Sequence, residues 1–259
     1  MNTLQFRHAL LNGLILLGAT ALTASGTSNN DKVLLASKQL GRGINLAGTL
    51  DAPKEGEWGV VLEASYFTAI RNAGFDSIII PIRWSAHADK NAPYQIDPIF
   101  MARVDWAVAQ GLQNNLTVLL KTHHYEGFAS EPEKELPRYY SIWEQIARHF
   151  SDRPDRVFFE ISNEPGYTFS SKQWNRVTAD VLKIIRRTNS IRTLVVCPVF
   201  GEALGALSSL ELPEEERNAL VRLYYFEPTE FTHQGASWIN GSKSWLGRKW
   251  TGTEQEKQA

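Results

Sequence analysis

The sequence predicts an α/β fold built from repeated strand–helix units, and three observations lead to this class. Short apolar runs recur without in/out alternation, which is typical of parallel strands buried on both faces. Apolar stripes at helical spacing lie between these runs. The strand–helix order repeats about six times without a linker, at roughly the 30-residue spacing of a βαβ unit. This pattern leaves two architectures open, a (β/α)8-type barrel and a doubly wound open sheet.

Each apolar run is short and rich in β-branched or aromatic residues, so each predicts one strand. The expected strands are 43–46, 77–82, 117–120, 157–161, 194–197 and 221–226.

Four apolar stripes predict helices between the strands. They lie at 62–73, 100–112, 136–150 and 174–185. Gly74 is placed to end the first of these helices, and Ser170 or Ser171 to cap the start of the fourth. The connection 203–220 is less regular.

Composition and motifs exclude several classes of protein. The 259 residues carry 27 Lys and Arg against 28 Asp and Glu, so there is no basic excess for a nucleic-acid partner. The single cysteine, Cys197, rules out an internal disulfide and a cysteine-rich zinc module. Gly41 and Gly43 are not followed by the third glycine of a dinucleotide-binding turn, and no phosphate loop is present.

The first residues predict a secretory signal peptide, assigned to 1–25. Arg7 precedes an apolar run at 9–24, and small residues at 19–21 and 24–26 offer cleavage sites. The run is too short for a stable membrane span. We therefore expect export to an extracellular or periplasmic location, with one domain at 40–259.

Polar side chains gather where the expected strands end. Arg83 and Trp84 follow the second strand, His123 and His124 the third, and Asn163 and Glu164 the fourth. The carboxyl ends of parallel strands meet at one edge, so these residues predict a shared cleft. Glu164, beside the Asn163 amide, is placed to act as a general acid, although a strand-end carboxylate also serves as a loop cap.

The adjacent histidines do not predict a metal site. Neighbouring residues on a strand point to opposite sides, and no Asp or His completes a ligand set in the sequence.

Six motifs, taken together and in order, carry a resemblance to a known family. They are RGIN at 42–45, APKEGEWG at 52–59, IPIRWS at 80–85, HHY at 123–125, NEP at 163–165 and FTHQGA at 231–236. From Leu40 onward the chain resembles glycoside hydrolase family 5, the cellulase-type endo-β-1,4-glucanases, in particular the compact bacterial type with mixed glucanase and mannanase activity.

The resemblance implies a (β/α)8 TIM barrel and a retaining reaction on a β-1,4-linked polysaccharide without a cofactor. Such a reaction uses two carboxyl groups about 5 Å apart. Glu164 matches the general acid/base, and Asn163 matches the amide that holds the sugar 2-hydroxyl. The remaining implied substrate contacts are His123, His124, Asp51, His233 and Trp238, and Trp84 is a further candidate.

The sequence also departs from the family. The nucleophile, a Glu at the end of strand 7 usually within Gly-Glu-Phe-Gly, has no counterpart here, so we expect an incomplete barrel of about six units that lacks strands 7 and 8. Ile79 stands where the family has an arginine, and Tyr224 and Phe226 where it has His-x-Tyr.

Three hypotheses follow from these departures: a glycosidase whose sequence is truncated, an inactive glucan-binding relative, or an unstable fragment. In each case we expect little or no turnover from these residues, because a lost nucleophile removes the covalent route. The sequence defines no protein partner.

Overall fold

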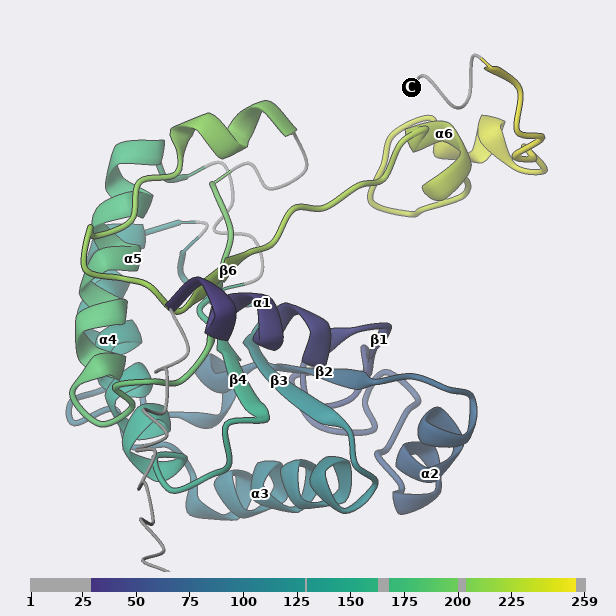
Figure 1. Ribbon diagram of the computed structural model, residues 1–259. Coiled ribbons are helices and arrows are strands. Elements are labelled where there is room, and N and C mark those ends of the chain that lie inside the picture. Colours follow the sequence, from purple (N-terminus) through teal and green to yellow (C-terminus); the bar gives the residue numbers. More distant parts are fainter. Residues whose placement is uncertain (1–28, 129, 163–167, 200–203, 255–259) are drawn as a thin grey trace, which may run out of the picture.

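The computed structural model describes residues 29–128, 130–162, 168–199 and 204–254, and its centre is one parallel sheet (Figure 1). The strands are β1 (Gly43–Asn45), β2 (Ser77–Ile82), β3 (Thr117–Thr122), β4 (Val157–Glu160), β5 (Leu194–Val196) and β6 (Ala219–Val221). They pair in sequential order from β1 to β6, each parallel to the next. A doubly wound sheet reverses its order at a switch point, and this sheet does not. The architecture is therefore of TIM-barrel type, with six strands in the described residues.

All four predicted helices are present beside the sheet. They are α2 (Ala64–Asn72), α3 (Pro98–Gln113), α4 (Pro132–His149) and α5 (Ser171–Arg186). Of the two serines considered, Ser170 caps α5: its hydroxyl accepts from the backbone N–H of Gln173, and the Gln173 side chain reaches back. Asp97 caps α3 by accepting from the N–H of Ile99 at 2.8 Å.

The sheet is buried on both faces, which explains the lack of alternation in its sequence. Ile78 and Ile80 of β2 join the large apolar core shared with α2 to α5. Leu119 and Phe158 face the other way into a second cluster on the inner side of the sheet. In β3, for example, Val118 and Leu120 lie in the large core and Leu119 between them lies in the inner cluster, as expected for a barrel wall.

An additional helix, α1 (Asn29–Leu40), covers the inner side of the sheet and was not predicted from the sequence. Ala36 is 4% exposed and packs in the inner cluster with Leu119 and Phe158. The helix ends at Leu40 and is followed by Gly41, whose φ of 46° lies in the left-handed region and whose Cβ, if present, would lie 2.4 Å from an Asp76 oxygen. A glycine is therefore required where the chain turns from α1 into β1.

The prediction for the sixth strand was wrong in position: β6 covers Ala219–Val221 rather than 221–226. Its length is set by β5, which offers three residues for pairing, from Leu194 opposite Ala219 to Val196 opposite Val221. The Arg222 N–H makes one further bond to the Val196 carbonyl at 2.8 Å. Among the described residues no strand pairs with the other edge of β6, so the apolar run beyond it leaves the sheet despite its β propensity.

The chain after β6 leads to a small lobe that lies apart from the sheet (Figure 1). The lobe contains the short helix α6 (Thr229–Thr232) and a 3-10 turn at Ser242–Trp245. None of the described helices has the length and apolar character needed to cross a membrane.

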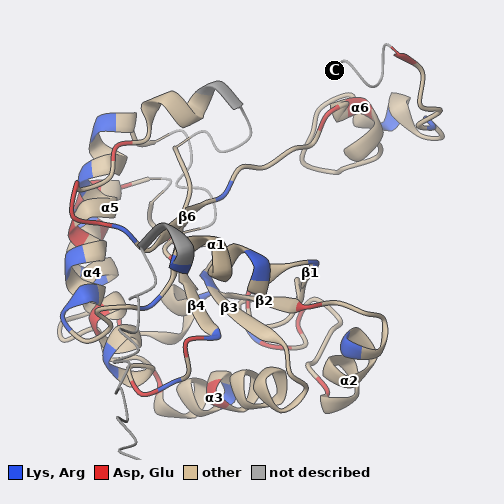
Figure 2. Cartoon of the chain, in the orientation of Figure 1, with Lys and Arg blue, Asp and Glu red and all other residues tan. Residues whose placement is uncertain are grey.

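Charged residues are dispersed over the outer helices. Figure 2 shows Lys and Arg interspersed with Asp and Glu along α4 and α5. Exposed pairs such as Arg176 with Glu133, at 2.8 Å, and Arg148 with Glu144, at 3.1 Å, join opposite charges there. The described surface of these helices therefore carries no strongly basic face.

Candidate active site

The centre of the site is a bond between the loop after β1 and the end of β3. Asp51 Oδ2 lies 3.1 Å from His123 Nδ1. The other carboxylate oxygen of Asp51 accepts from the Thr49 N–H at 2.9 Å, and the His123 N–H donates to the Ile82 carbonyl at 2.9 Å. With its side chain 2% exposed, Asp51 is held in one orientation by backbone and imidazole.

His124 lies beside His123 on the same side of the chain. The two ring centroids are 3.9 Å apart, with planes inclined at 39°. β3 ends at Thr122, and His124 has a left-handed backbone with φ of 46°. The premise that these neighbours point to opposite sides was therefore wrong, because the rule for a strand does not apply beyond its end.

The charges at this centre are set by burial and by the Asp51–His123 bond. Burial raises the pKa of the Asp51 carboxyl, but the hydrogen bond and charge of His123, together with the Thr49 N–H, outweigh it and lower the pKa. Burial, assisted by His123, lowers the pKa of His124 to about 4. Near neutral pH the site thus offers an ionised carboxylate next to a neutral imidazole.

Trp58 is part of this site and was not singled out from the sequence, although it lies within one of the motifs. It is 45% exposed and meets the His124 ring edge-on, with centroids 5.6 Å apart. Its loop is anchored by Glu55, which accepts two bonds from Arg103 and one from the Leu62 N–H. An exposed indole on an anchored loop beside two histidines is the kind of surface that sugar rings stack on.

Arg83, in the loop after β2, and Glu126, in the loop after β3, form an ion pair at the edge of the site. Arg83 donates to Glu126 at 2.8 Å, and the Glu126 N–H donates to the Ser85 hydroxyl at 3.1 Å. The Arg83 side chain is thereby held near His124, and its charge helps to lower the pKa of that imidazole.

A layer of charged side chains lies below the histidines on the inner side of the sheet. Lys121 of β3 is the register partner of Glu160 of β4, and Arg222 lies 3.2 Å from the Glu160 carboxylate. The Tyr224 ring lies 5.4 Å from Lys121 Nζ and 6.0 Å from the Arg222 guanidinium. Tyr224, where the family has a histidine, therefore contacts cations through its ring face. Sequence reasoning missed this layer because Lys and Arg are rare inside barrels.

Trp84 does not belong to the substrate surface. Its side chain is 1% exposed and packs edge-on against Phe100 of α3, with centroids 5.8 Å apart. The expectation of a sugar contact at Trp84 is corrected, because a ring enclosed by the core presents no face to a ligand.

The remaining predicted residues lie elsewhere. His233 and Trp238 are in the lobe of α6, apart from the strand ends that carry Asp51 and His123 (Figure 1). In that lobe His233 contacts Phe226 edge-on, with centroids 5.1 Å apart, and Trp238 is 78% exposed. Asn163 and Glu164 fall outside the described residues, so their roles stay predictions.

A sequential parallel sheet with polar side chains at its carboxyl edge defines the class of (β/α)-barrel proteins whose site lies at that edge. The family profile described as Cellulase (glycosyl hydrolase family 5) matches residues 38–257. The chain belongs to this family.

Solved structures and curated relatives agree with this assignment. The structure of Thermotoga maritima Cel5A in complex with mannotriose is 40% identical with a TM-score of 0.84, covering 87% of this chain and 73% of that one. The cellulose synthase subunit Z of Clostridioides difficile is 32% identical with a TM-score of 0.77, covering 84% and 71%. Endoglucanase H of Acetivibrio thermocellus is 32% identical over 197 residues, which are 76% of this chain and 22% of that protein. The chain thus spans about a fifth of that relative's length.

Proposed function

We propose that this chain recognises β-1,4-linked glucan at the carboxyl edge of its sheet and belongs to a retaining glycoside hydrolase. The observation that supports this most is the group formed by Asp51, His123 and His124, with Trp58 on its open side, in a family 5 fold. Ionised Asp51 and the imidazoles supply acceptors and donors for sugar hydroxyls, and the indole supplies an apolar face. Thermotoga maritima Cel5A has been solved in complex with cellobiose and with mannotriose, which makes mannan a second substrate to test.

In the proposed reaction Glu164 is the general acid/base and Asn163 holds the sugar 2-hydroxyl. Retaining hydrolysis also requires a carboxylate nucleophile about 5 Å from the acid/base. Residues 1–259 supply no counterpart of that nucleophile motif. For these residues alone we propose glucan binding with little or no turnover.

Hydrolysis is tested by the release of reducing sugar from carboxymethyl-cellulose. We expect little or no release from the 259-residue chain, and loss of any measurable release in Glu164→Gln. Glu144→Gln on the outer face of α4 is the control, since the exposed Glu144 side chain pairs with Arg148 at 3.1 Å on the same helix. Robust release by the wild type, or release unaffected in Glu164→Gln, contradicts the proposal.

Binding is tested separately by affinity electrophoresis in gels that contain β-glucan or mannan. We expect retardation in β-glucan that weakens at least several-fold in His123→Ala and is kept in His149→Ala, whose imidazole at the end of α4 pairs with Asp105 of α3 at 2.7 Å. Retardation without turnover favours a glucan-binding relative. A near-ultraviolet circular-dichroism spectrum without aromatic bands, together with no retardation, favours an unstable fragment instead.

We also propose that the protein is exported, on the strength of the charged, apolar and small-residue order of residues 1–25. Mass spectrometry of the protein after expression with its leader tests this. A new N-terminus between Thr20 and Asp31 supports export, and an intact Met1 in the mature protein contradicts it.

A further inference from the structure

We propose that Asp51, His123 and His124 form a binding site for a divalent transition-metal ion of the zinc and copper class. Each residue offers one ligand atom, and the three atoms lie within 4.8 Å of one another. The left-handed backbone of His124 brings the second imidazole to the same side as the first, and the loop after β1 supplies the carboxylate.

The ligand set selects the class of ion. Two imidazole nitrogens and one carboxylate oxygen suit Zn²⁺ and Cu²⁺, whereas Mg²⁺ and Ca²⁺ prefer shells made of oxygen alone. Three protein ligands leave a tetrahedral ion one position for water. His123 is half-buried and His124 is exposed, which provides an entry path.

The Asp51–His123 pair is already close to the spacing of two zinc ligands, and the His124 ring, whose ligand atom lies within 4.8 Å of the other two, would close on the ion. Asp51 Oδ2 and His123 Nδ1 are 3.1 Å apart. Two ligands bound tetrahedrally at about 2.0–2.1 Å from zinc lie roughly 3.4 Å apart. The ion would replace the hydrogen bond between these two atoms, and the proton on His123 would reside on the outer ring nitrogen.

The carboxylate ligand is already oriented by backbone contacts. The second oxygen of Asp51 accepts from the Thr49 N–H at 2.9 Å, and the Thr49 hydroxyl donates to the Leu46 carbonyl at 2.6 Å. Such outer contacts fix the ligand direction and commonly change metal affinity by 10- to 100-fold. Asp51 is therefore prepared to bind an ion without first being ordered.

Two cationic side chains near the site disfavour the binding of a positively charged ion. Arg83 and Lys121 both act electrostatically on His124. Arg83 is balanced by Glu126 at 2.8 Å, and Lys121 lies next to Glu160 in the sheet register. We therefore expect an exchangeable ion that a chelator removes, rather than a structural zinc on which folding depends.

The consequence for activity rests on the proposed glucan site, because the ion and the sugar would use the same three side chains. Metal binding and sugar binding should then exclude each other. Direct metal binding does not depend on that function, so the two proposals fail independently.

The test is calorimetric titration of the full chain with ZnCl₂ in a non-chelating buffer. We expect one saturable site per chain, reversed by EDTA, and at least a tenfold weaker affinity in both Asp51→Asn and His124→Ala. His149→Ala is the matched control, since it removes a histidine that also pairs with a carboxylate, Asp105 at 2.7 Å, but that belongs to no group of three metal-ligating side chains among the described residues. Near-ultraviolet circular dichroism checks that each variant is folded.

A second measurement, the Tm with and without Zn²⁺, is needed because a variant that unfolds would also lose metal binding. Zn²⁺ bound only by the native state raises the Tm, so we expect a rise for the wild type and for His149→Ala that Asp51→Asn lacks. No saturable binding to the wild type, or equal affinity in all variants, overturns the metal site.

Cellotetraose then separates the two proposals. We expect a saturating concentration to weaken Zn²⁺ binding at least threefold. Zinc binding that cellotetraose leaves unchanged keeps the metal site and argues against the glucan site at these residues. Retardation of the chain in β-glucan gels without zinc binding keeps the glucan site and overturns the metal site.

Discussion

The left-handed backbone of His124, with φ of 46°, turns its ring toward His123 and away from the direction that strand geometry would give it. That one dihedral angle decides which groups can act together. It places the second imidazole beside the His123–Asp51 pair and in edge contact with Trp58. Sequence position at a strand end was enough to select both histidines, but no local signal indicated the positive φ of a non-glycine residue.

The lowered pKa of His124 predicts a definite pH dependence of stability. The unfolded chain takes up the proton at the ordinary value of 6.5, whereas burial delays protonation of the folded state to about 4. The unfolded state thus binds more protons in this window, and stability falls as pH falls through it. We expect the Tm of the wild type, relative to His124→Gln, to decrease between about pH 6.5 and 4 and to level off below. Thermal unfolding at a series of pH values measures this Tm difference. A Tm difference that stays constant across the range contradicts the lowered pKa of His124.

Removal of the Trp58 ring should weaken sugar binding without unfolding the protein. Its ring is 45% exposed, so Trp58→Ala removes contact area for a ligand but little core packing. We expect roughly 1 kcal/mol weaker glucan binding in Trp58→Ala, about fivefold, and partial retention in Trp58→Phe. Affinity electrophoresis measures the change, with Trp250→Ala in the α6 lobe as the control. Equal retardation of the Ala variant and the wild type would remove Trp58 from the site.

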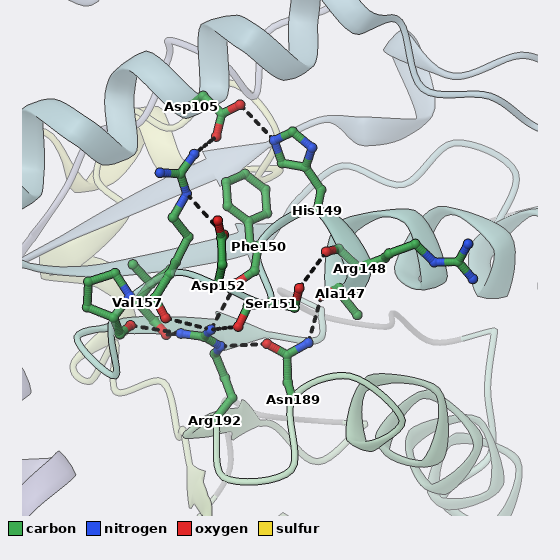
Figure 3. A network of polar contacts seen from close by, with 12 residues as sticks. Asp105, Ala147, Arg148, His149, Phe150, Ser151, Asp152, Val157, Asn189 and Arg192 are labelled. Atoms are coloured by element: carbon green, nitrogen blue, oxygen red, sulfur yellow. Dashed lines mark hydrogen bonds and ion pairs between the residues drawn. The ribbon is translucent and has the colours of Figure 1, made fainter.

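At the scale of the elements, one arginine side chain joins several of the connections between helices and strands (Figure 3). Arg192, just before β5, donates to the carbonyls of Phe150, Pro154 and Val157, each at 2.8 Å. Asn189 accepts from Arg192 at 2.9 Å and donates to the Ala147 carbonyl at 2.7 Å. Burial lowers the pKa of this guanidinium against the opposing charges of Asp155 and Asp152. The surrounding carbonyls accept hydrogen bonds from its N–H groups.

This network predicts that Arg192→Lys is not conservative. An ammonium group cannot reach carbonyls on several sides at once, so buried acceptors lose their donors. We expect a loss of about 2 kcal/mol or more in unfolding free energy, measured by urea denaturation. Arg187→Lys on the exposed end of α5 should change it by less than about 0.5 kcal/mol. Equal effects of the two substitutions would show that the network contributes little.

The elements that sequence reasoning placed well are those with strong local signals. β2 is bounded as predicted, and α5 begins where Ser170 and Gln173 form a capping box. β6 was misplaced because pairing with the short β5, rather than local β propensity, decides where it ends. α1 was missed because its few buried residues cover the inner side of a sheet, a contact that only the assembled fold creates.

At the scale of the whole molecule, α1 is the element that covers the inner face of the sheet. Ala36 packs with Leu119, Phe158 and Val195 from three strands, while Leu34 and Leu35 are exposed on the same helix. The inner face thus depends on a helix that precedes the first strand, as well as on the strands.

Ala36→Glu tests this arrangement. A carboxylate placed against the apolar inner cluster is desolvated without a partner, and we expect a loss of at least about 2 kcal/mol in unfolding free energy. Ser37→Glu, one residue along on the exposed side of α1, should be nearly neutral. Chemical denaturation followed by tryptophan fluorescence compares the two. If both variants match the wild type, α1 does not rest on the sheet.

The central claim is that Asp51, His123 and His124 form a glucan site in a family 5 fold, and the most direct test is NMR of the histidine ring signals during titration with cellotetraose. We expect the His123 and His124 signals to shift in a saturable way while the signal of His149, paired with Asp105 between α3 and α4, stays in place. In Asp51→Asn the shifts should require a higher sugar concentration. Histidine signals that do not move at saturating cellotetraose, or that move equally at His149, would contradict the claim.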